Sequence, residues 1–289
     1  MIEPVLKDEA LLEDVARAGG EAPDALHVRW LGQSGFLLEW NGCRVLLDPY
    51  LSDSLTRKYA ATDKPHVRMT ARCVDPGALT GIQFVTASHA HTDHLDGETL
   101  RAVAAANPGV RLLFPGMIRD EVRRRLEGAE VEEVELNAGD EAYFDAEQVR
   151  FCGVTAAHNE VVQDDYGRSE CVGFLLQMGE FRIYHSGDTL WHEGLLEKLL
   201  EWRCDLMLLP INGNKPERRV AGNLNGTEAA ALARAGDSRW VVPCHYEMFE
   251  FNTESPAEFV TACERLGQPH RVMRCGERLV LPRSRFEED

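Results

Sequence analysis

The sequence predicts an α/β (α+β) protein in which two β-sheets pack against each other and helices cover the outside. Strand-rich segments are followed by alternating helices and strands, and this succession occurs in both halves of the chain. Metal-capable side chains come directly after several of the apolar runs that indicate buried strands. With 289 residues, of which 44% are hydrophobic, the chain has enough apolar material for a sizeable core.

The first part of the chain predicts one helix and then a set of strands. Apolar residues at helical spacing over 7–18 predict a helix that Gly19-Gly20 ends, within a leading helical segment at 1–26. Strands are expected over 27–31, 36–40 and 43–47, with Asn41-Gly42 as a hairpin turn. Residues 51–80 are polar and predict a long loop that overhangs a site.

The remaining chain alternates between strand and helix patterns. Strands are expected over 82–87, 110–114, 131–136, 148–157, 171–178, 181–185, 205–209, 240–243 and near 271–281, and helices over 98–106, 117–126, 190–202, 227–235 and 256–266. We interpret the basic residues between 119 and 125 as a solvated helix face. Since no repeat, linker or domain boundary is visible, we expect residues 1–289 to form a single domain.

Charge and cysteine usage limit the class of protein. The formal charge of −17 repels phosphate backbones and argues against nucleic acid as a partner, although a small anion can still enter a cleft that holds cations. The eight cysteines form no Cys-x-x-Cys pair, and no secretory or membrane-spanning run is visible. We therefore expect a soluble, cytoplasmic protein with no membrane partner. The sequence is compatible with a homo-oligomer.

The segment from Ser88 to Asp96 carries four metal-capable side chains, His89, His91, Asp93 and His94. It follows an apolar run that predicts a buried strand. Imidazole and carboxylate ligands suit Zn²⁺, Mn²⁺ or Fe. His89 and His91 can face one metal centre while Asp93 and His94 face another. The alternative is a His-rich surface loop that binds metal only opportunistically.

Three further metal-capable residues, His158, Asp188 and His245, follow later predicted strands in the same way. Polar side chains at the ends of buried strands gather at one rim, where loops can form a site. Each residue alone is more simply a turn residue, but the joint pattern indicates a metal site. In addition, Asp48 follows a predicted strand, and it is either a carboxylate that orients a metal ligand or a simple turn residue before Pro49.

The order His-x-His-x-Asp-His, then His, Gly-Asp and His, resembles the metallo-β-lactamase superfamily. Within it, the segments Trp30-Leu-Gly-Gln-Ser-Gly35, Tyr184-His-Ser-Gly-Asp-Thr189 and Pro243-Cys-His-Tyr246 are similar to the L-ascorbate-6-phosphate lactonase-like hydrolases. The resemblance covers roughly residues 27–260. It implies a four-layer αββα sandwich that holds two metal ions at the rim between its sheets.

The resemblance also implies how the ligands are shared between the two ions. His89, His91 and His158 would bind the first ion, Asp93, His94 and His245 the second, and Asp188 would bridge both. We expect Zn²⁺, with Mn²⁺ or Fe as alternatives. Two such ions about 3.5–4 Å apart lower the pKa of a shared water towards about 7.

From this chemistry we expect a dinuclear metal-dependent hydrolase that uses a metal-bridging hydroxide on a small anionic metabolite, with Asp93 accepting the proton of the attacking water. The resemblance implies that the bond is a lactone, as in a sugar-phosphate lactone. The alternatives are a phosphodiesterase of the same fold and an iron-dependent thiol-oxidising enzyme.

The loop at 212–225 concentrates basic and amide side chains in an otherwise acidic chain, which suits a phosphate or carboxylate group on the substrate. A solvated surface loop is the alternative. The expected substrate-binding residues are Asn212, Asn214, Lys215, Arg218, Arg219 and Tyr246.

Overall fold

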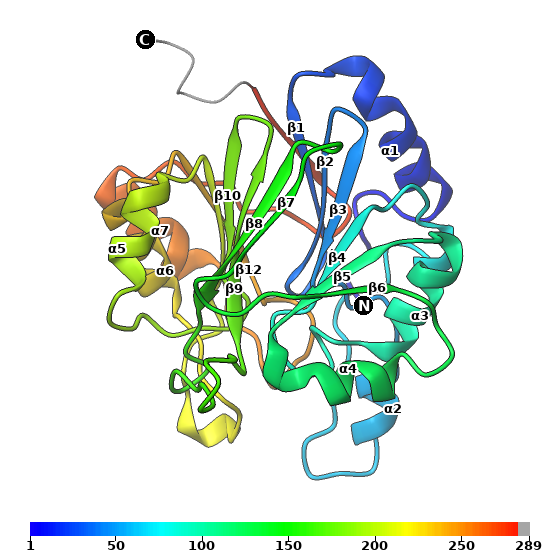
Figure 1. The fold of residues 1–289 in the computed structure, drawn as a ribbon. Coiled ribbons are helices and arrows are strands. Elements are labelled where there is room, and N and C mark those ends of the chain that lie inside the picture. The colour runs from blue at the N-terminus through cyan, green and yellow to red at the C-terminus, as the bar shows by residue number, and fades with distance from the viewer. Residues whose placement is uncertain (283–289) are drawn as a thin grey trace.

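The computed structural model describes residues 1–282 as two mixed β-sheets packed face to face, with helices on their outer sides (Figure 1). One sheet has the strand order β13-β1-β2-β3-β4-β5-β6, and the other has the order β12-β11-β10-β9-β8-β7. The predicted four-layer αββα sandwich is therefore confirmed. Each half of the chain builds one sheet, except that the last strand returns to the first sheet.

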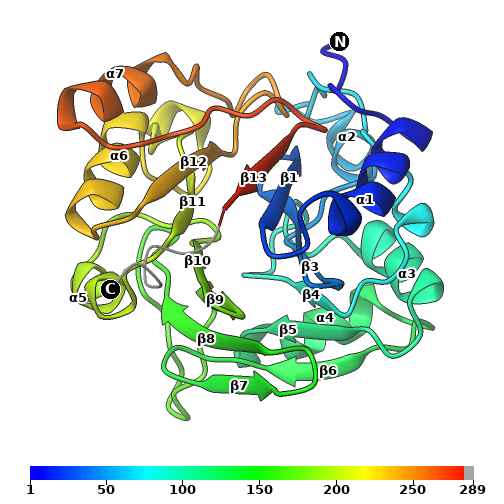
Figure 2. The same ribbon diagram turned by 90° about the horizontal axis from the view of Figure 1, so that it is seen from above.

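The first sheet contains β1 (Leu26–Gly32), β2 (Gly35–Trp40), β3 (Cys43–Leu47), β4 (Phe84–Thr86), β5 (Arg111–Phe114), β6 (Glu132–Glu135) and β13 (Arg278–Leu281). The pairs from β13 to β3 are antiparallel, and those from β3 to β6 are parallel. The helices α1 (Glu9–Glu21), α2 (Ser54–Tyr59), α3 (Gly97–Ala106) and α4 (Arg119–Arg125) lie on this side of the molecule (Figure 2).

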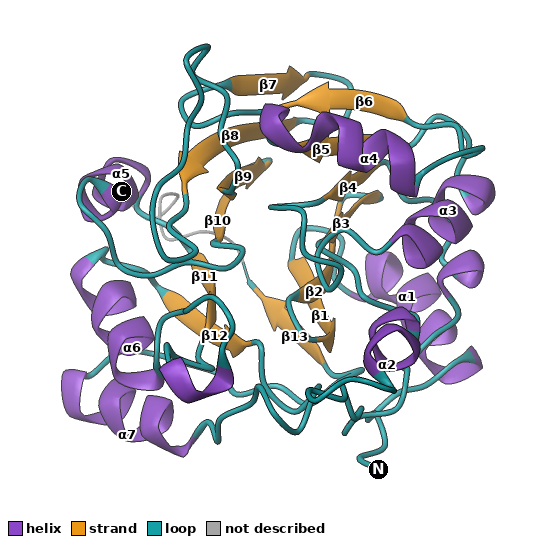
Figure 3. Ribbon diagram, turned by 90° about the horizontal axis from the view of Figure 1, so that it is seen from below, coloured by secondary structure: helices purple, strands orange, loops and turns teal. Residues whose placement is uncertain are grey.

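The second sheet contains β7 (Glu141–Phe144), β8 (Val149–Thr155), β9 (Val172–Met178), β10 (Phe181–His185), β11 (Leu206–Pro210) and β12 (Trp240–Cys244). Antiparallel pairs join β7 to β10, and parallel pairs join β10 to β12. The helices α5 (Leu195–Trp202), α6 (Gly226–Ala235) and α7 (Ala257–Leu266) lie on the opposite side from α1 to α4 (Figure 3).

Alternation along β2 and β3 divides their side chains between two hydrophobic clusters. Phe36 and Leu38 point into the core between the sheets, whereas Leu37 joins the cluster under the helices. Because both faces are covered, these strands are apolar almost throughout, as expected for sheets buried on both sides. The turn between them is a type I′ hairpin, with φ of 47° at Asn41 and 77° at Gly42, as the sequence predicts.

The structure corrects several predicted boundaries. Helix α1 runs past Gly19-Gly20 to Glu21, because its buried Leu11, Val15 and Ala18 dock it on the protein and outweigh the low helix propensity of glycine. Helix α5 begins at Leu195 and not at 190, since Gly194 before it has a left-handed φ of 82°.

The other corrections concern the loop at 51–80 and the sheet edges. The loop contains the short α2, and the polar edge strand β7 has no apolar pattern that could have predicted it. A single strand, β13, stands where strands were expected near 271–281. No helix within residues 1–282 has the length and hydropathy needed to cross a bilayer.

A buried ion pair fixes α1 to the first sheet. The fully buried Arg29 of β1 donates to Asp14 of α1 at 2.8 Å and lies 3.5 Å from Glu39 of β2. Breaking such a pair from one side leaves an under-compensated buried charge. The packing of α1 on the first sheet therefore depends on Asp14 more than on the exposed acidic residues of the same helix.

We predict that Asp14→Ala lowers the free energy of unfolding by about 2–4 kcal/mol, below the upper end for a buried pair because Glu39 still faces Arg29. Urea unfolding measures the loss. Glu13→Ala, an exposed acid on the same helix, is the matched control and should change stability by less than about 0.5 kcal/mol. Equal effects of the two substitutions would contradict this role of Arg29.

Candidate metal centre

The metal-capable side chains all follow the carboxyl ends of strands. His89, His91, Asp93 and His94 lie in the segment after β4, and His158, Asp188 and His245 follow β8, β10 and β12. Because β10 and β12 both run parallel to β11, their carboxyl ends meet at the same edge of the second sheet. The segment after β4 brings its four residues to that edge from the first sheet.

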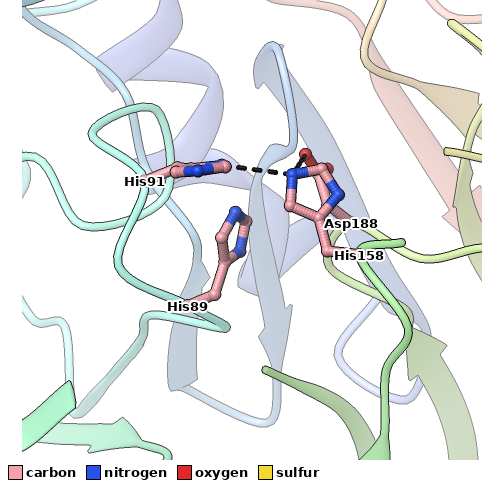
Figure 4. Close-up of side chains that lie close together, drawn as sticks. All are labelled: His89, His91, His158 and Asp188. Atoms are coloured by element: carbon pink, nitrogen blue, oxygen red, sulfur yellow. Dashed lines mark hydrogen bonds and ion pairs between the residues drawn. The ribbon is translucent and has the colours of Figure 1, made fainter. Parts of the chain in front are cut away.

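The structure brings the seven residues together in two groups. Within each group, the ligand atoms lie within 4.8 Å of one another. The first ligand group consists of His89, His91, His158 and Asp188, and the second ligand group consists of Asp93, His94 and His245. Figure 4 shows the side chains of the first group converging from three segments, with His158 Nε2 3.1 Å from His91 Nδ1. In the second group, His245 Nε2 lies 3.5 Å from Asp93 Oδ2.

Asp188 lies between the two groups. Its Oδ2 is 3.7 Å from His158 Nε2 of the first group and 3.4 Å from His245 Nε2 of the second. Its Oδ1 is 3.2 Å from His94 Nε2. One carboxylate therefore reaches ligands of both groups, which is the geometry required of a residue that bridges two ions.

Several buried polar atoms at this centre have no hydrogen-bond partner among the described residues. They are His89 Nε2, His94 Nε2 and Asp188 Oδ1. A buried polar atom without a partner costs about 1–3 kcal/mol, so three of them in one cluster need a further explanation. Metal ions would supply the missing partners, and the His and Asp donors suit Zn²⁺, Mn²⁺ or Fe. The residues present therefore fit two metal ions.

Protonation differs between the two groups. Burial is the main cause that holds the pKa of His89 and of His91 below the usual range, so that both are neutral and ready to bind metal. Burial also acts to lower the pKa of His245, but the Asp188 and Asp93 carboxylates outweigh it and raise the value to about 9. The second group therefore holds protons at neutral pH that a metal ion has to displace.

Asp48 supports the second ligand group from behind. Its Oδ2 lies 2.7 Å from His94 Nδ1, and its Oδ1 accepts hydrogen bonds from Thr86 Oγ1 at 2.7 Å and from the Ser88 amide at 3.1 Å. The Ser88 hydroxyl also donates to this carboxylate. These contacts leave His94 Nε2 as the atom that faces the centre, and a carboxylate that orients a metal ligand would make the same contact.

Gln33, which was not predicted to act at the site, also reaches the second ligand group. Its amide nitrogen lies 2.8 Å from Asp93 Oδ2 and 3.0 Å from His245 Nε2. It sits in the tight connection between β1 and β2 with a left-handed φ of 52°. The only signal in the sequence was its place within the motif around Trp30, from which a resemblance to a subfamily was inferred but no role for this residue.

Arg125 corrects the interpretation of the basic helix face. Its guanidinium donates to the carbonyl oxygens of Leu95 at 2.5 Å and Ala90 at 2.7 Å, and to Thr92 Oγ1 at 3.3 Å. It therefore holds the ligand-bearing segment in shape, whereas Arg123 and Arg124 form exposed ion pairs. No sequence pattern distinguishes Arg125 from its neighbours, because the carbonyl groups that it binds lie some thirty residues earlier.

Two backbone features complete the centre. Gly187 has a left-handed φ of 57°, and a Cβ there would come within 2.6 Å of the Ser88 side chain, so only glycine lets the turn before Asp188 approach. Two ligand-region residues that are not glycine also adopt positive φ, with values of 37° at Asp48 and 61° at His245. Strained backbone of this kind is typical of functional sites.

The two groups line a pocket of about 410 Å³. Its lining includes His91, Asp93, His158, Asp188 and His245. A larger hollow of about 650 Å³ is lined by residues of β7 to β9, among them Tyr143 and Arg150, and contains none of the metal-capable residues. The candidate metal centre therefore opens into the smaller pocket and not into the larger hollow.

The predicted substrate-binding residues do not all reach this pocket. Arg219 lines it, whereas Lys215 and Arg218 both pair with Glu254. Asn212 is buried and donates to Asn252, and Asn214 is exposed outside the lining. Tyr246 is buried, stacks on Trp30 at 4.5 Å and donates to the Met273 carbonyl oxygen. Of the predicted substrate-binding residues, Arg219 is therefore the one that lines the pocket, where Val220 and Ala221 of the same loop lie beside it.

Comparisons with known proteins agree with this geometry. The sequence model of the family described as "Beta-lactamase superfamily domain" matches residues 43–246. A protein from Caldivirga maquilingensis, described as a UPF0173 metal-dependent hydrolase, is 29% identical over 260 residues, which are 89% of this chain and 98% of that protein.

Two solved structures share the fold at lower sequence identity. Igni18, described as a novel metallo hydrolase from Ignicoccus hospitalis, is 22% identical with a TM-score of 0.65, covering 90% of this chain and all of that one (100%). An isothiocyanate hydrolase from Delia radicum gut bacteria is 19% identical with a TM-score of 0.69, covering 88% of this chain and 98% of that one.

We predict that Asp188→Ala reduces the metal content from about two ions per chain to fewer than one, because this carboxylate reaches both ligand groups. Elemental analysis of protein reconstituted with Zn²⁺ gives the count. Asp165→Ala, at an exposed aspartate, is the control and should retain the full content. Two ions in the Asp188 variant would contradict a bridging role.

We also predict a pH-dependent stability of the metal-free protein. The pKa of His245 is about 9 in the folded protein and about 6.5 in the unfolded chain. Protonated His245 therefore stabilises the fold fully below pH 6.5, and this contribution is lost as the pH rises through 9. The free energy of unfolding after chelation should therefore fall over that range. Urea unfolding at several pH values measures it. Protein loaded with Zn²⁺ should show a smaller fall, since the metal replaces the proton, and identical curves would refute the prediction.

Proposed function

Since the chain belongs to the metallo-β-lactamase superfamily, we propose that it is a metal-dependent hydrolase that acts with two divalent ions on a small anionic metabolite. The observation that carries this proposal is the convergence of seven His and Asp side chains, among them Asp188 between the two groups, of which five line one pocket. The similarity to proteins described as metal-dependent hydrolases supports it.

The first ion would be held by His89, His91 and His158, the second by Asp93, His94 and His245, and both by Asp188. When bound, such ions lower the pKa of water and polarise the oxygen of the substrate bond. Zn²⁺ is our first choice because every ligand is an imidazole or a carboxylate, and Mn²⁺ and Fe accept the same donors.

The chain's own residues hold the reacting groups in place. Asp93 stays ionised, because neighbouring His94 and His245 outweigh burial and hold the pKa of this carboxyl well below its usual range. It can therefore accept the proton that an attacking water loses. The Gln33 amide, 2.8 Å from Asp93 Oδ2, fixes the orientation of this carboxylate.

The pocket and the surface charge favour a small anion. A volume of about 410 Å³ suits a metabolite. Lys58, Lys64 and Arg219 line the pocket, although the protein as a whole carries a formal charge of −17. That overall charge disfavours nucleic acid as a substrate. We propose a lactone as the bond hydrolysed, and a phosphodiester as the alternative that the same centre could serve.

All eight cysteines are free and seven of them are buried. Reduced thiols in this number are typical of a reducing compartment. They support our proposal of a cytoplasmic location.

The proposed function can be tested with chelated protein reconstituted with Zn²⁺, Mn²⁺ or Fe²⁺ and assayed on a panel of lactones and phosphodiesters. We expect hydrolysis only after reconstitution. Asp93→Asn should lower kcat by about 10²–10⁴-fold, the range for loss of a positioned proton acceptor. Asp165→Asn, at an exposed position, should leave the rate unchanged.

Two results would overturn the proposal. One is hydrolysis that survives complete removal of metal, and the other is full activity of the Asp93 variant. Activity on phosphodiesters but not on lactones would support a metal-dependent hydrolase and show that the bond cleaved is a phosphodiester and not a lactone.

A further inference from the structure

One side of the pocket is formed by aromatic rings that no metal ligand uses. This aromatic wall consists of Tyr59, His66, Phe249 and Phe251, all of which line the pocket. His66 lies at its centre, with ring centroids 4.2 Å from Tyr59, 4.5 Å from Phe251 and 5.1 Å from Phe249. Leu55 extends the same surface. Tyr59 stacks on His66 at an interplanar angle of 19°, whereas Phe251 and Phe249 are inclined to the His66 ring by 58° and 69°. A largely apolar aromatic surface, made of ring faces and ring edges, therefore borders the proposed metal centre.

His66 does not make this wall polar at neutral pH. Its Nδ1 lies 3.0 Å from the Lys64 carbonyl oxygen, so that this nitrogen carries the proton of the neutral ring and donates it. Burial lowers the pKa of His66, and this effect exceeds the opposing effects of the hydrogen bond to the Lys64 backbone and of the Asp93 carboxylate. The ring is therefore mainly neutral at pH 7 and does not add a charge to the aromatic wall.

The mouth of the pocket carries a set of cations, which we name the cationic rim: Lys58, Lys64 and Arg219. The Lys64 ammonium donates to the Arg219 carbonyl oxygen at 2.5 Å, which joins the loop after α2 to the loop before α6. Arg219 pairs with Asp63 at 2.8 Å, but both side chains are more than half exposed. An exposed pair of this kind is weak and leaves Arg219 able to bind an incoming anion.

We propose that the substrate is a small amphiphilic anion with three parts: a hydrolysable group at the metal centre, a planar apolar body on the aromatic wall, and a carboxylate or phosphate at the cationic rim. The inference rests on the proposed function, because it takes the metal centre as the place where the bond is cleaved. It adds a preference that the metal ligands alone do not give.

The same surfaces disfavour a polyhydroxy substrate such as a sugar phosphate. Hydroxyl groups placed against the aromatic wall would lose their hydrogen bonds to water without gaining partners. A planar ring gains apolar contact there, and its offset or edge-on packing against other rings is favourable. The aromatic wall would therefore favour anions with a planar ring over polyhydroxy anions, although the metal centre would bind both classes equally well.

Three phosphonates of increasing size separate these contributions. Methylphosphonate offers only the group that binds metal, benzylphosphonate adds a ring, and 4-carboxybenzylphosphonate adds a second anion. Calorimetry with Zn²⁺-loaded protein gives the affinity of each. We expect the ring to improve the affinity by at least about tenfold through apolar burial. The carboxylate should add about three- to tenfold at low salt, less at high salt.

Matched variants assign each gain to its surface. Phe251→Ala should remove most of the gain from the ring, while Tyr143→Ala, an exposed aromatic residue of the larger hollow, should not. Arg219→Gln should reduce the gain from the carboxylate, while Arg123→Gln should not, although Arg123 also forms an exposed ion pair. Methylphosphonate should bind the Tyr143 and Arg123 variants as it binds the parent protein. In the Phe251 and Arg219 variants, each gain is taken relative to methylphosphonate bound to the same variant.

Each outcome separates this inference from the proposed function. If benzylphosphonate binds no better than methylphosphonate, or if Phe251→Ala leaves the gain unchanged, the aromatic wall does not bind substrate and the inference is overturned. A carboxylate gain that Arg219→Gln leaves intact overturns the part assigned to the cationic rim. Methylphosphonate could instead bind equally with and without Zn²⁺ while the gains from the ring and the carboxylate persist. That result would overturn the proposed metal centre and would still support the preference for amphiphilic anions.

Discussion

The carboxylate of Asp48 is the contact on which the rest of the centre depends. It is fully buried at the end of β3, where an unpaired charge would cost several kcal/mol, of the order expected for a buried ion. Hydrogen bonds from Thr86, Ser88 and His94 offset that cost. The same bonds hold the end of β3 to the end of β4 and aim His94 at the metal centre. One buried charge thus determines both the local fold and the direction of a ligand.

The anionic substrate that we propose would have to approach an acidic protein. The negative charge of Asp93 and Asp188 lies at the floor of the pocket, where metal ions would neutralise it. The cations of the rim stand at the entrance, next to the loops that carry them. An approaching anion therefore meets positive charge first, and the general negative surface acts at a distance that salt screens.

The sequence predicted the layers of the fold and singled out seven metal-capable residues that the structure brings together, because both depend on local patterns. Apolar runs locate the strands, and His89, His158 or His245 can be identified by its place after such a run. The aromatic wall could not be predicted, since Tyr59 and His66 meet Phe249 and Phe251 only in the folded chain. The same limit explains the expectation for Lys215 and Arg218, whose partner Glu254 lies more than thirty residues away. Local composition showed their charge but not that this charge was already paired.

Three residues at the centre, Gln33, Asp48 and His245, have a left-handed backbone although none is glycine. Each such conformation costs about 1 kcal/mol or more, which the surrounding packing has to offset. A selection for thermal stability alone would therefore favour glycine or asparagine at these positions and would lose the amide, the carboxylate and the imidazole with it. The protein thus retains a trade-off between stability and activity in its backbone as well as in its side chains.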